Sequence, residues 1–317
     1  MNGRNKTKIA LVKPSNEPLA NWASWCDGLY GALDILGKEF NIRVFGYSDT
    51  PAVIKKDNIE IQLADNPSSL KYWLRAFNPK LIFGWGVSYD PWKEIKDFEG
   101  KKVLLNAGGP PDKDKADKNF DAVVVENESD KEHFDTEYVA FGTNTDYFKP
   151  MELEKYFPAI YPAAFAAYKR HDLWAKVVPP GSLAIGHIQT HEIECYETVV
   201  RGGHIALPQI SMDTIPHFYN QSIATVLTPT RMGGCQRAAL ESMACNIPVL
   251  TTLDSKASEF EGVWAAPPIA SELAQAYMVM VVGFTQNPVK LREKYIIGKY
   301  DQHTYADKLR KVVWDLI

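Results

Sequence analysis

The stretch that decides the fold is TRMGGCQRAALESMACNIPVLTT, residues 230–252, which places two glycines directly before a segment with helical spacing. The preceding run ATVLTP (224–229) predicts a buried strand, so Gly233 and Gly234 stand at a strand-to-helix turn. Glycines let an anion come close to the unpaired N–H groups and the positive dipole of a helix start. The turn therefore predicts a phosphate site, and Glu241 lies where a carboxylate could accept hydrogen bonds from ribose hydroxyls. A plain tight turn followed by a solvated glutamate is the alternative.

The rest of the chain alternates short apolar runs with amphipathic segments. In the first half we predict strands at KIALVKP (8–14), IRVFGY (42–47), KLIFGWG (80–86), KKVLLNAGG (101–109) and FDAVVVEN (120–127). Helices are predicted at 25–40 and at 68–77, the second with Ser68 or Ser69 as its N-terminal cap. The rhythm restarts near residue 157, with further strands at 157–165, 181–188, 204–209, 224–229 and 247–252 and helices at 191–203, 272–286 and 304–317. This alternation is typical of mostly parallel sheets that are covered by helices on both faces.

Two such units in succession predict two domains, for which 317 residues are sufficient. The segment FKPMELEKYFP (148–158) has two prolines and a charged middle, and we place the hinge there. The expected domains are therefore residues 1–150 and 151–300. In doubly wound domains of this kind, ligands bind at the carboxyl ends of the strands.

The bulk composition excludes several classes of protein. Hydrophobic residues make up 45% of the chain and the net charge is −4, so nothing global favours a nucleic acid or an anionic membrane as the partner. The four cysteines show no zinc-ligand spacing, which favours reduced thiols and a cytoplasmic protein. We see no signal peptide and no apolar run long enough to span a bilayer. The expected place of action is the cytoplasm, with peripheral contact to a membrane surface left open.

Three segments resemble the retaining GT-B glycosyltransferases, especially those of family four. That family has a donor-site segment ending Leu-Glu-Ala-Met-Ala-Cys-Gly-x-Pro-Val, and residues 240–249 read Leu-Glu-Ser-Met-Ala-Cys-Asn-Ile-Pro-Val. FGTNTDYFKP (141–150) is similar to the segment NGVDTDRFRP that joins the two domains of the family. AAYKRHDLWAKVV (166–178) is similar to the stretch where a lysine meets the donor diphosphate.

The resemblance implies an α/β protein of the GT-B fold, with two doubly wound Rossmann-like domains facing a central cleft. It implies an N-terminal acceptor-binding domain, a C-terminal nucleotide-sugar-binding domain and a last helix, residues 301–317, that packs back on the first domain. The implied activity is transfer of a sugar from a UDP- or GDP-sugar to a glycan, a lipid or a small molecule. Retention, no metal and no cofactor are expected with it.

Residue roles carry over in part. Glu241 takes the position of the ribose ligand and Lys169 that of the diphosphate ligand, whereas a family glutamate that touches the donor sugar falls on Gly233. A family arginine falls on Ala164, so Arg170, Arg231 or Arg237 has to supply its charge. Strand ends at 186–192 and 206–211 are expected to hold the base. The predicted donor site therefore comprises Gly186, Leu207, Gln209, Gly233, Gly234, Cys235, Gln236, Arg237 and Glu241.

The chemistry follows from charge. Lys169 and Arg170, with the helix start, are expected to stabilise the leaving diphosphate where negative charge develops. In a retaining reaction the leaving phosphate takes the proton of the acceptor, and no protein nucleophile is needed. An inverting reaction instead needs a general base, for which Asp27 and Asp112 are the candidates.

The acceptor is expected to meet aromatic side chains of the first domain. Trp22, Trp25 and Trp85 stand near strand ends and offer faces that stack on sugar rings, although core packing is the alternative for each. His187 and His191 have a spacing that superficially resembles a zinc pair, but they follow a strand, so we predict no metal.

Two other classes of function remain open. An epimerase or a phosphorylase could use the same fold, and the glycine at position 233 is compatible with a protein that binds a nucleotide sugar without turnover. A nucleic-acid acceptor is disfavoured by the acidic net charge. The sequence leaves the sugar, the base, the acceptor, the stereochemistry and the oligomeric state open.

Overall fold

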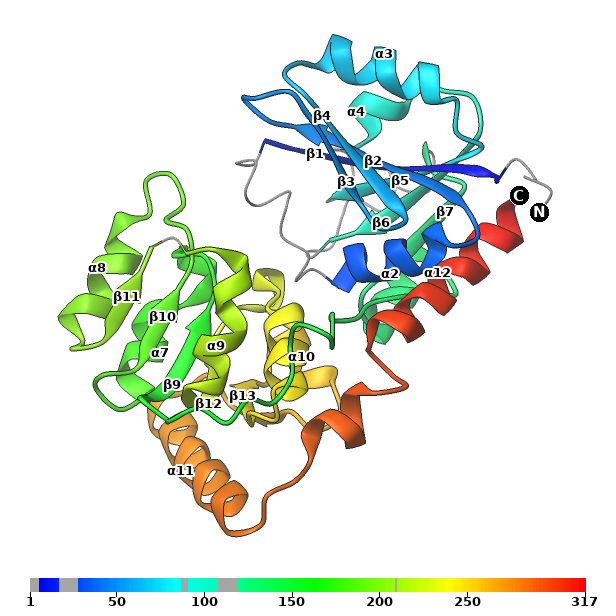
Figure 1. Ribbon diagram of the computed structural model, residues 1–317. Coiled ribbons are helices and arrows are strands. Elements are labelled where there is room, and N and C mark those ends of the chain that lie inside the picture. The colour runs from blue at the N-terminus through cyan, green and yellow to red at the C-terminus, as the bar shows by residue number, and fades with distance from the viewer. Residues whose placement is uncertain (1–5, 17–27, 87–90, 108–118, 209) are drawn as a thin grey trace. The chain divides into compact units, whose positions relative to one another are not determined.

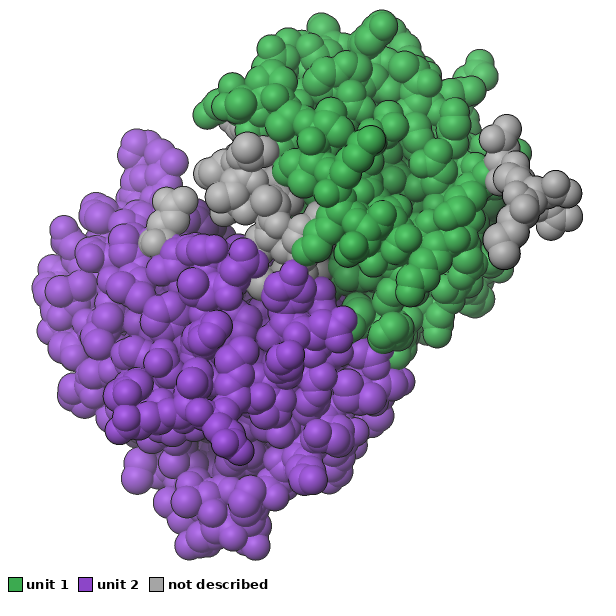
Figure 2. Space-filling view, viewed as in Figure 1, with its two compact units in different colours: residues 1–141, 302–317 green, residues 142–301 purple. Residues whose placement is uncertain are grey.

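The computed structural model describes residues 6–16, 28–86, 91–107, 119–208 and 210–317 (Figure 1). The chain divides into two compact units, residues 1–141 with 302–317 and residues 142–301 (Figure 2). Residues 142–150, which the sequence prediction placed in the first domain, therefore belong to the second. The physical reason is local: Thr143 N–H donates to Tyr300 O at 2.8 Å, and Arg292 donates to Phe148 O at 2.6 Å.

The sheet of the first unit has the strand order β3-β4-β2-β1-β5-β6-β7-β8 among the described residues. Its strands are β1 (Lys8–Asn16), β2 (Asn41–Tyr47), β3 (Ala52–Lys56), β4 (Ile59–Ala64), β5 (Leu81–Gly86), β6 (Lys101–Asn106), β7 (Ala122–Val125) and β8 (Tyr138–Val139). The β3–β4 pair is antiparallel and the other pairs are parallel. The five strands predicted in this half are confirmed, and the β3–β4 hairpin is an addition that the sequence did not predict.

The helices of the first unit are α2 (Gly28–Gly37), α3 (Pro67–Phe77), α4 (Trp92–Ile95), α6 (Lys131–Phe134) and α12 (Gln302–Leu316), with a single 3-10 turn η1 (Glu128–Asp130) among the described residues. The cap of α3 is Asn66, whose side chain accepts from Ser69 N–H at 2.9 Å, so the prediction of Ser68 or Ser69 as cap was wrong. Pro67 at the first helical position favours this start because its missing N–H needs no partner there.

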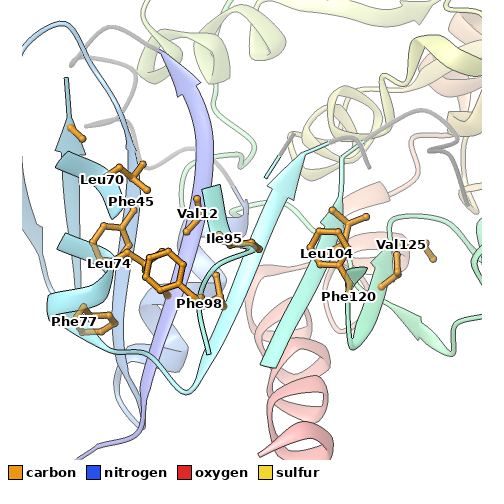
Figure 3. Close-up of a cluster of buried hydrophobic side chains, with 14 of the residues drawn as sticks. Val12, Phe45, Leu70, Leu74, Phe77, Ile95, Phe98, Leu104, Phe120 and Val125 are labelled. Carbon is orange, nitrogen blue, oxygen red and sulfur yellow. The ribbon is translucent and has the colours of Figure 1, made fainter. Parts of the chain in front are cut away.

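A buried core lies between α3, α4 and the sheet (Figure 3). Phe45 of β2 packs against Phe77 of α3 with tilted rings whose centroids are 5.9 Å apart, and Leu70 and Leu74 of the same core are fully buried. The last helix, α12, belongs to the same unit: Arg310 bonds Glu39 at 2.9 Å. Burial of these apolar side chains supplies the main favourable term for folding of the unit.

The sheet of the second unit is fully parallel, in the order β11-β10-β9-β12-β13-β14 among the described residues. Its strands are β9 (Phe157–Pro162), β10 (Leu183–Ile185), β11 (Ile205–Leu207), β12 (Ser222–Leu227), β13 (Val249–Thr252) and β14 (Trp264–Ala266). The helices are α7 (His171–Val177), α8 (Ile193–Arg201), α9 (Ile215–Asn220), α10 (Gln236–Ala244) and α11 (Ala270–Gln286). Short turns are η2 (Ala167–Lys169), η3 (Met212–Thr214), η4 (Arg231–Gly233), η5 (Lys256–Glu259) and the π-turn η6 (Arg292–Ile296).

The stretch 230–252 forms the turn η4, helix α10 and strand β13, as its pattern predicts. A buried bond of 2.7 Å between the hydroxyls of Thr225 and Ser242 ties β12 to α10. Asn246 ends the helix at φ 59°, in the left-handed region that asparagine tolerates better than most residues. Among the described residues, no helix has both the length and the apolarity needed to cross a bilayer.

Candidate functional site

Two loops meet at the carboxyl edge of the second sheet, one after β9 and one after β12. Thr230 N–H donates to Tyr168 O at 2.9 Å, and the Thr228 hydroxyl donates to Lys169 O at 3.1 Å. From below, the buried Tyr161 hydroxyl donates to Lys169 O at 2.8 Å. The loop that carries η2 is thus fixed against the loop that carries η4.

Lys169 reaches from the first of these loops to the start of α10. Its ammonium donates to Gly233 O, and it lies 3.2 Å from the Cys235 sulfur. The side chain is half-buried. The structure therefore brings Lys169 together with Gly233, Gly234 and Cys235, which the sequence places 64 to 66 residues away. A cation beside a helix start, whose first N–H groups have no partner within the helix, favours an anionic ligand.

The glycine turn has a backbone that larger residues cannot adopt. Gly234 has φ 68° and ψ −127°, a region that residues with a side chain rarely enter. A Cβ atom on Gly233 would lie 2.8 Å from Tyr168 O and 2.7 Å from Pro229 Cβ. The position where the resemblance places a glutamate therefore has no room for any side chain while the two loops are packed in this way. Cys235 follows at φ 78° and precedes the first residue of α10, the buried Gln236.

Arg170 is engaged by protein groups. It lies at φ 52°, donates to Thr228 O at 2.6 Å through Nε, and pairs with both oxygens of Asp254 at 2.8 and 2.9 Å. A further bond of 2.9 Å reaches the Thr252 hydroxyl. Burial alone would raise the pKa of Asp254, but the hydrogen bonds from Arg170 and Thr252 outweigh burial and lower it. Arg170, which the sequence predicts as a phosphate-facing cation, thus has its guanidinium bonded to protein groups that connect the η2 loop to the ends of β12 and β13.

Glu241 is buried in α10, so the alternative of a solvated glutamate is wrong. The Tyr219 hydroxyl of α9 donates to one of its oxygens at 3.0 Å, and Arg237, one turn earlier on α10, lies 3.4 Å from the other. Burial, and then the charge of Glu241, raise the pKa of Tyr219 well above its usual value. A buried carboxylate needs such partners, because desolvating an unpaired charge costs several kcal/mol, roughly. Arg237 itself is half exposed at the surface of the helix.

The predicted base site falls partly within the described residues. Gly186 follows β10, and a Cβ atom there would lie 2.0 Å from Ala163 O, so only glycine allows the two strand ends to approach. Its N–H donates to Leu207 O at 3.1 Å, which places Leu207 at the same edge. Gln209 lies outside the described residues, as do Asp27, Asp112, Trp22 and Trp25 of the predicted catalytic and acceptor sets.

Trp85 lies at the carboxyl end of β5 in the first unit and is half-buried. The Lys13 ammonium of the neighbouring strand β1 lies 4.9 Å from the centroid of the Trp85 ring, a cation–π distance. Lys13 was not among the predicted site residues, although its place at the end of the predicted strand 8–14 was a usable signal.

The histidines do not form a metal site within the described chain. His187 and His191 are exposed, and Glu192 accepts from Ala167 N–H at 3.0 Å and so caps η2. No group of three or more His, Cys, Asp or Glu side chains among the described residues could hold a metal ion. The described cysteines, Cys195, Cys235 and Cys245, form no disulfide.

His171, two residues after Lys169, is buried. Its ring stacks on Phe165 and lies against Tyr161, with centroids 4.9 Å away in each case. Burial, followed by the positive charge of Lys169, lowers the pKa of His171 to about 4. The ring is therefore neutral near pH 7 and adds no charge to the site.

Several solved structures resemble this chain over nearly its whole length. Sucrose-phosphate synthase from Thermosynechococcus elongatus superposes with a TM-score of 0.74 at 14% identity, over 98% of this chain and 99% of that one. HepE from Anabaena in complex with UDP gives 0.69 at 13%, over 98% and 100%. The UDP-forming alpha,alpha-trehalose-phosphate synthase from Burkholderia xenovorans in complex with glucose-6-phosphate gives 0.69 at 10%, over 97% and 100%. No protein-family model and no curated protein sequence matches the chain. The structural likeness extends over nearly the whole length, and the chain has the GT-B fold of these glycosyltransferases.

Proposed function

We propose that the protein is a glycosyltransferase that moves a sugar from a nucleotide-sugar donor to a small-molecule acceptor. The observation that carries this proposal is the Lys169 ammonium at the glycine turn before α10, bonded to Gly233 O and 3.2 Å from the Cys235 sulfur. A UDP-sugar is the donor we favour, since a protein of the same fold holds UDP.

In the proposed reaction the donor diphosphate lies against the backbone N–H groups of Gly234, Cys235 and Gln236. Lys169 exchanges its bond to a carbonyl for one to a phosphate oxygen, where it stabilises the charge that grows as the sugar–phosphate bond breaks. The acceptor oxygen bonds to the anomeric carbon, and its proton passes to the leaving phosphate oxygen. This scheme retains the configuration and requires neither a protein nucleophile nor a metal.

Two further roles belong to the same proposal. Glu241 binds the ribose hydroxyls, with Tyr219 and Arg237 holding its carboxylate in place. Arg170 is a positioning residue: its pair with Asp254 holds the backbone of the η2 loop, and with it Lys169, against β12. Gly186 and Leu207 line the place of the base.

The acceptor proposal rests on the first unit. We place the sugar ring of the acceptor on the face of Trp85, with the Lys13 ammonium beside it. A phosphorylated sugar fits this pair, because the aromatic ring can stack on the C–H face of a sugar and the ammonium attracts a phosphate. A solved structure of the same fold holds glucose-6-phosphate, which supports this class.

One observation favours a second candidate, a protein that binds a nucleotide sugar without turnover. No side chain fits at Gly233, so the carboxylate that the resemblance expects at the donor sugar is missing. An epimerase or a phosphorylase is the third candidate. An epimerase would form an isomerised donor and a phosphorylase a sugar 1-phosphate, whereas a glycosyltransferase forms a glycosylated acceptor.

A panel of UDP-, GDP-, ADP- and CMP-sugars tests the proposal, with and without sugar phosphates as acceptors. Transfer or slow donor hydrolysis with one nucleotide supports the glycosyltransferase. Isomerised donor or sugar 1-phosphate as product supports the third candidate. Saturable binding with no product after long incubation supports the second, and absence of binding to every donor contradicts the proposal.

A further inference from the structure

Helix α11 lies on the surface of the second unit with an uncharged outer side. Its inner residues Leu273, Tyr277 and Met280 are buried, whereas Met278 is 57% and Val279 53% exposed. No charged residue occurs between Glu272 and Lys290. A surface helix normally carries charged side chains opposite the core, so packing among the described residues does not account for the composition of α11.

The apolar side of the helix leads into a cavity of about 570 Å³. Val279 and Val282 lie one turn apart, and Gly283, which lines the cavity, lies four residues after Val279 and hence on the same face. The cavity walls include Trp264, Phe284, Val289, Leu291 and Tyr295. We call the exposed part of this region the α11 surface, defined by the side chains of Trp264, Met278, Val279, Val282 and Val289.

Lysines stand at the margin of the α11 surface. Lys294 and Lys299 place their ammonium groups 4.9 and 5.9 Å from the centroid of the Tyr295 ring, which lines the cavity. Lys290 is exposed and directly follows Val289. Segment 287–299 has four basic residues, Lys290, Arg292, Lys294 and Lys299, and one acid, Glu293. Lys299 bonds Glu261 at 2.7 Å, and Arg292 donates to backbone carbonyls.

Aliphatic side chains with a tryptophan, a tyrosine and lysines at the margin match the layered chemistry of a bilayer surface. Apolar groups enter the acyl boundary, aromatic rings lie at the headgroup level, and ammonium groups contact anionic headgroups. We propose that the α11 surface binds a bilayer of anionic phospholipid, with the cavity accepting an apolar part of one lipid.

The proposed lipid site lies at the amino ends of the strands of the second sheet, and the proposed donor site lies at their carboxyl ends. Pro248, which lines the cavity, directly precedes β13, Gly262 lies two residues before β14, and Trp264 is the first residue of β14. The loops that hold Lys169 and Gly233 follow the strands at the other edge. Nucleotide binding can therefore be measured independently, and the lipid proposal does not rest on the proposed function.

The test is sedimentation of the full chain with vesicles of pure phosphatidylcholine and of phosphatidylcholine with 30% phosphatidylglycerol, a composition on the order of anionic cell membranes. Two double variants address the two components: Val279→Gln with Val282→Gln, and Lys290→Glu with Lys294→Glu. The matched controls are Ile193→Gln with Val200→Gln, which are exposed side chains of α8, and Lys38→Glu with Lys80→Glu, which are exposed lysines of the first unit.

We expect the wild type to bind the anionic vesicles and to bind the neutral ones at least tenfold more weakly. The Val279→Gln, Val282→Gln variant and the Lys290→Glu, Lys294→Glu variant should each lose at least tenfold in binding to anionic vesicles, because each lysine near the membrane surface contributes measurably. The control variants should bind as the wild type does. Absence of binding to anionic vesicles overturns the proposal, and so does equal loss in the control variants. Analytical ultracentrifugation, which measures the oligomeric state, tests the alternative that a second copy of the chain covers the α11 surface. A wild-type dimer that the Val279→Gln, Val282→Gln variant dissociates, without vesicle binding, shows that a second copy covers the α11 surface and also overturns the proposal.

Discussion

The Lys169 ammonium lies 3.2 Å from the Cys235 sulfur, although the two residues belong to different loops of the second unit. Lys169 reaches across because η2 and η4 are packed backbone to backbone, with Thr230 N–H bonded to Tyr168 O. The contact places a positive charge at the start of α10, where the helix dipole alone would disfavour it. An anion between the ammonium and the helix start would be attracted by both.

The packing of the two loops predicts that Gly233→Ala destabilises the protein. The added Cβ would lie 2.8 Å from Tyr168 O, so backbone has to move, at a cost of about 1–3 kcal/mol in the free energy of unfolding. Urea denaturation measures this cost. Gly283→Ala in α11 is the control, because its Cβ meets nothing within 4 Å and alanine favours a helix by about 0.5–1 kcal/mol. Equal stability of the Gly233→Ala variant and the wild type would show that the loops are not packed as described.

Arg170 is expected to act on the fold of the loop rather than on the phosphate. Arg170→Lys keeps the charge but cannot form the two parallel bonds to Asp254, so the thermal midpoint should fall. Nucleotide affinity, measured where both proteins are folded, should fall by less than the tenfold expected for Lys169→Gln, about 1.4 kcal/mol, because Arg170 acts on the nucleotide only by holding Lys169 in place. A variant with unchanged stability and strongly reduced affinity for UDP would instead make Arg170 a phosphate ligand.

Because the pKa of the buried His171 is lowered, we expect the free energy of unfolding to fall in mild acid. Its pKa is about 4 in the folded protein and near 6.5 when unfolded, so between these values the unfolded chain binds the proton and the folded chain does not. Stability therefore falls as pH drops from 6.5 towards 4, by on the order of 3 kcal/mol. Urea denaturation at pH 7.5 and pH 5 should show a smaller difference for His171→Phe than for wild type. His187→Gln, at an exposed histidine, should behave as wild type, and an unchanged difference in His171→Phe would refute the assignment.

Glu241 is expected to distinguish ribose from deoxyribose. Calorimetry with UDP and 2′-deoxy-UDP should show tighter binding of UDP, because a hydrogen bond to a carboxylate contributes about 1.5–3 kcal/mol. Glu241→Gln should reduce that preference, whereas Tyr219→Phe should preserve most of it, since Tyr219 contacts the carboxylate and not the ribose. A preference for ribose that survives in Glu241→Gln would place the nucleotide elsewhere.

The sequence predicted the strand–helix alternation and the glycine turn because both are local patterns. It missed the β3–β4 hairpin, an antiparallel addition at the sheet edge, and β14, whose three residues are too few for a periodic signal. It placed Lys169 at the turn, but only through the resemblance. The engagement of Arg170 was beyond local patterns, because Asp254 lies 84 residues away and the φ of 52° at Arg170 is set by tertiary contacts.

The burial of Glu241 is a second feature that depends on tertiary contacts and so could not be predicted from the local sequence. On the helix face alone, a glutamate one to two turns into α10 is compatible with solvent. Its side chain is buried, and one of its oxygens accepts from Tyr219 of α9, 22 residues away along the chain. Helical periodicity reports which residues share a face, but it does not report which element covers that face.

The most direct test of the central claim is calorimetric titration of UDP and of uridine into wild type, Lys169→Gln and Lys176→Gln. Lys176 is an exposed lysine at the end of α7 and serves as the control. If the Lys169 ammonium binds the diphosphate, Lys169→Gln weakens UDP at least tenfold, about 1.4 kcal/mol. It leaves uridine unchanged, and Lys176→Gln leaves both unchanged. Equal affinity of wild type and Lys169→Gln for UDP would contradict the account.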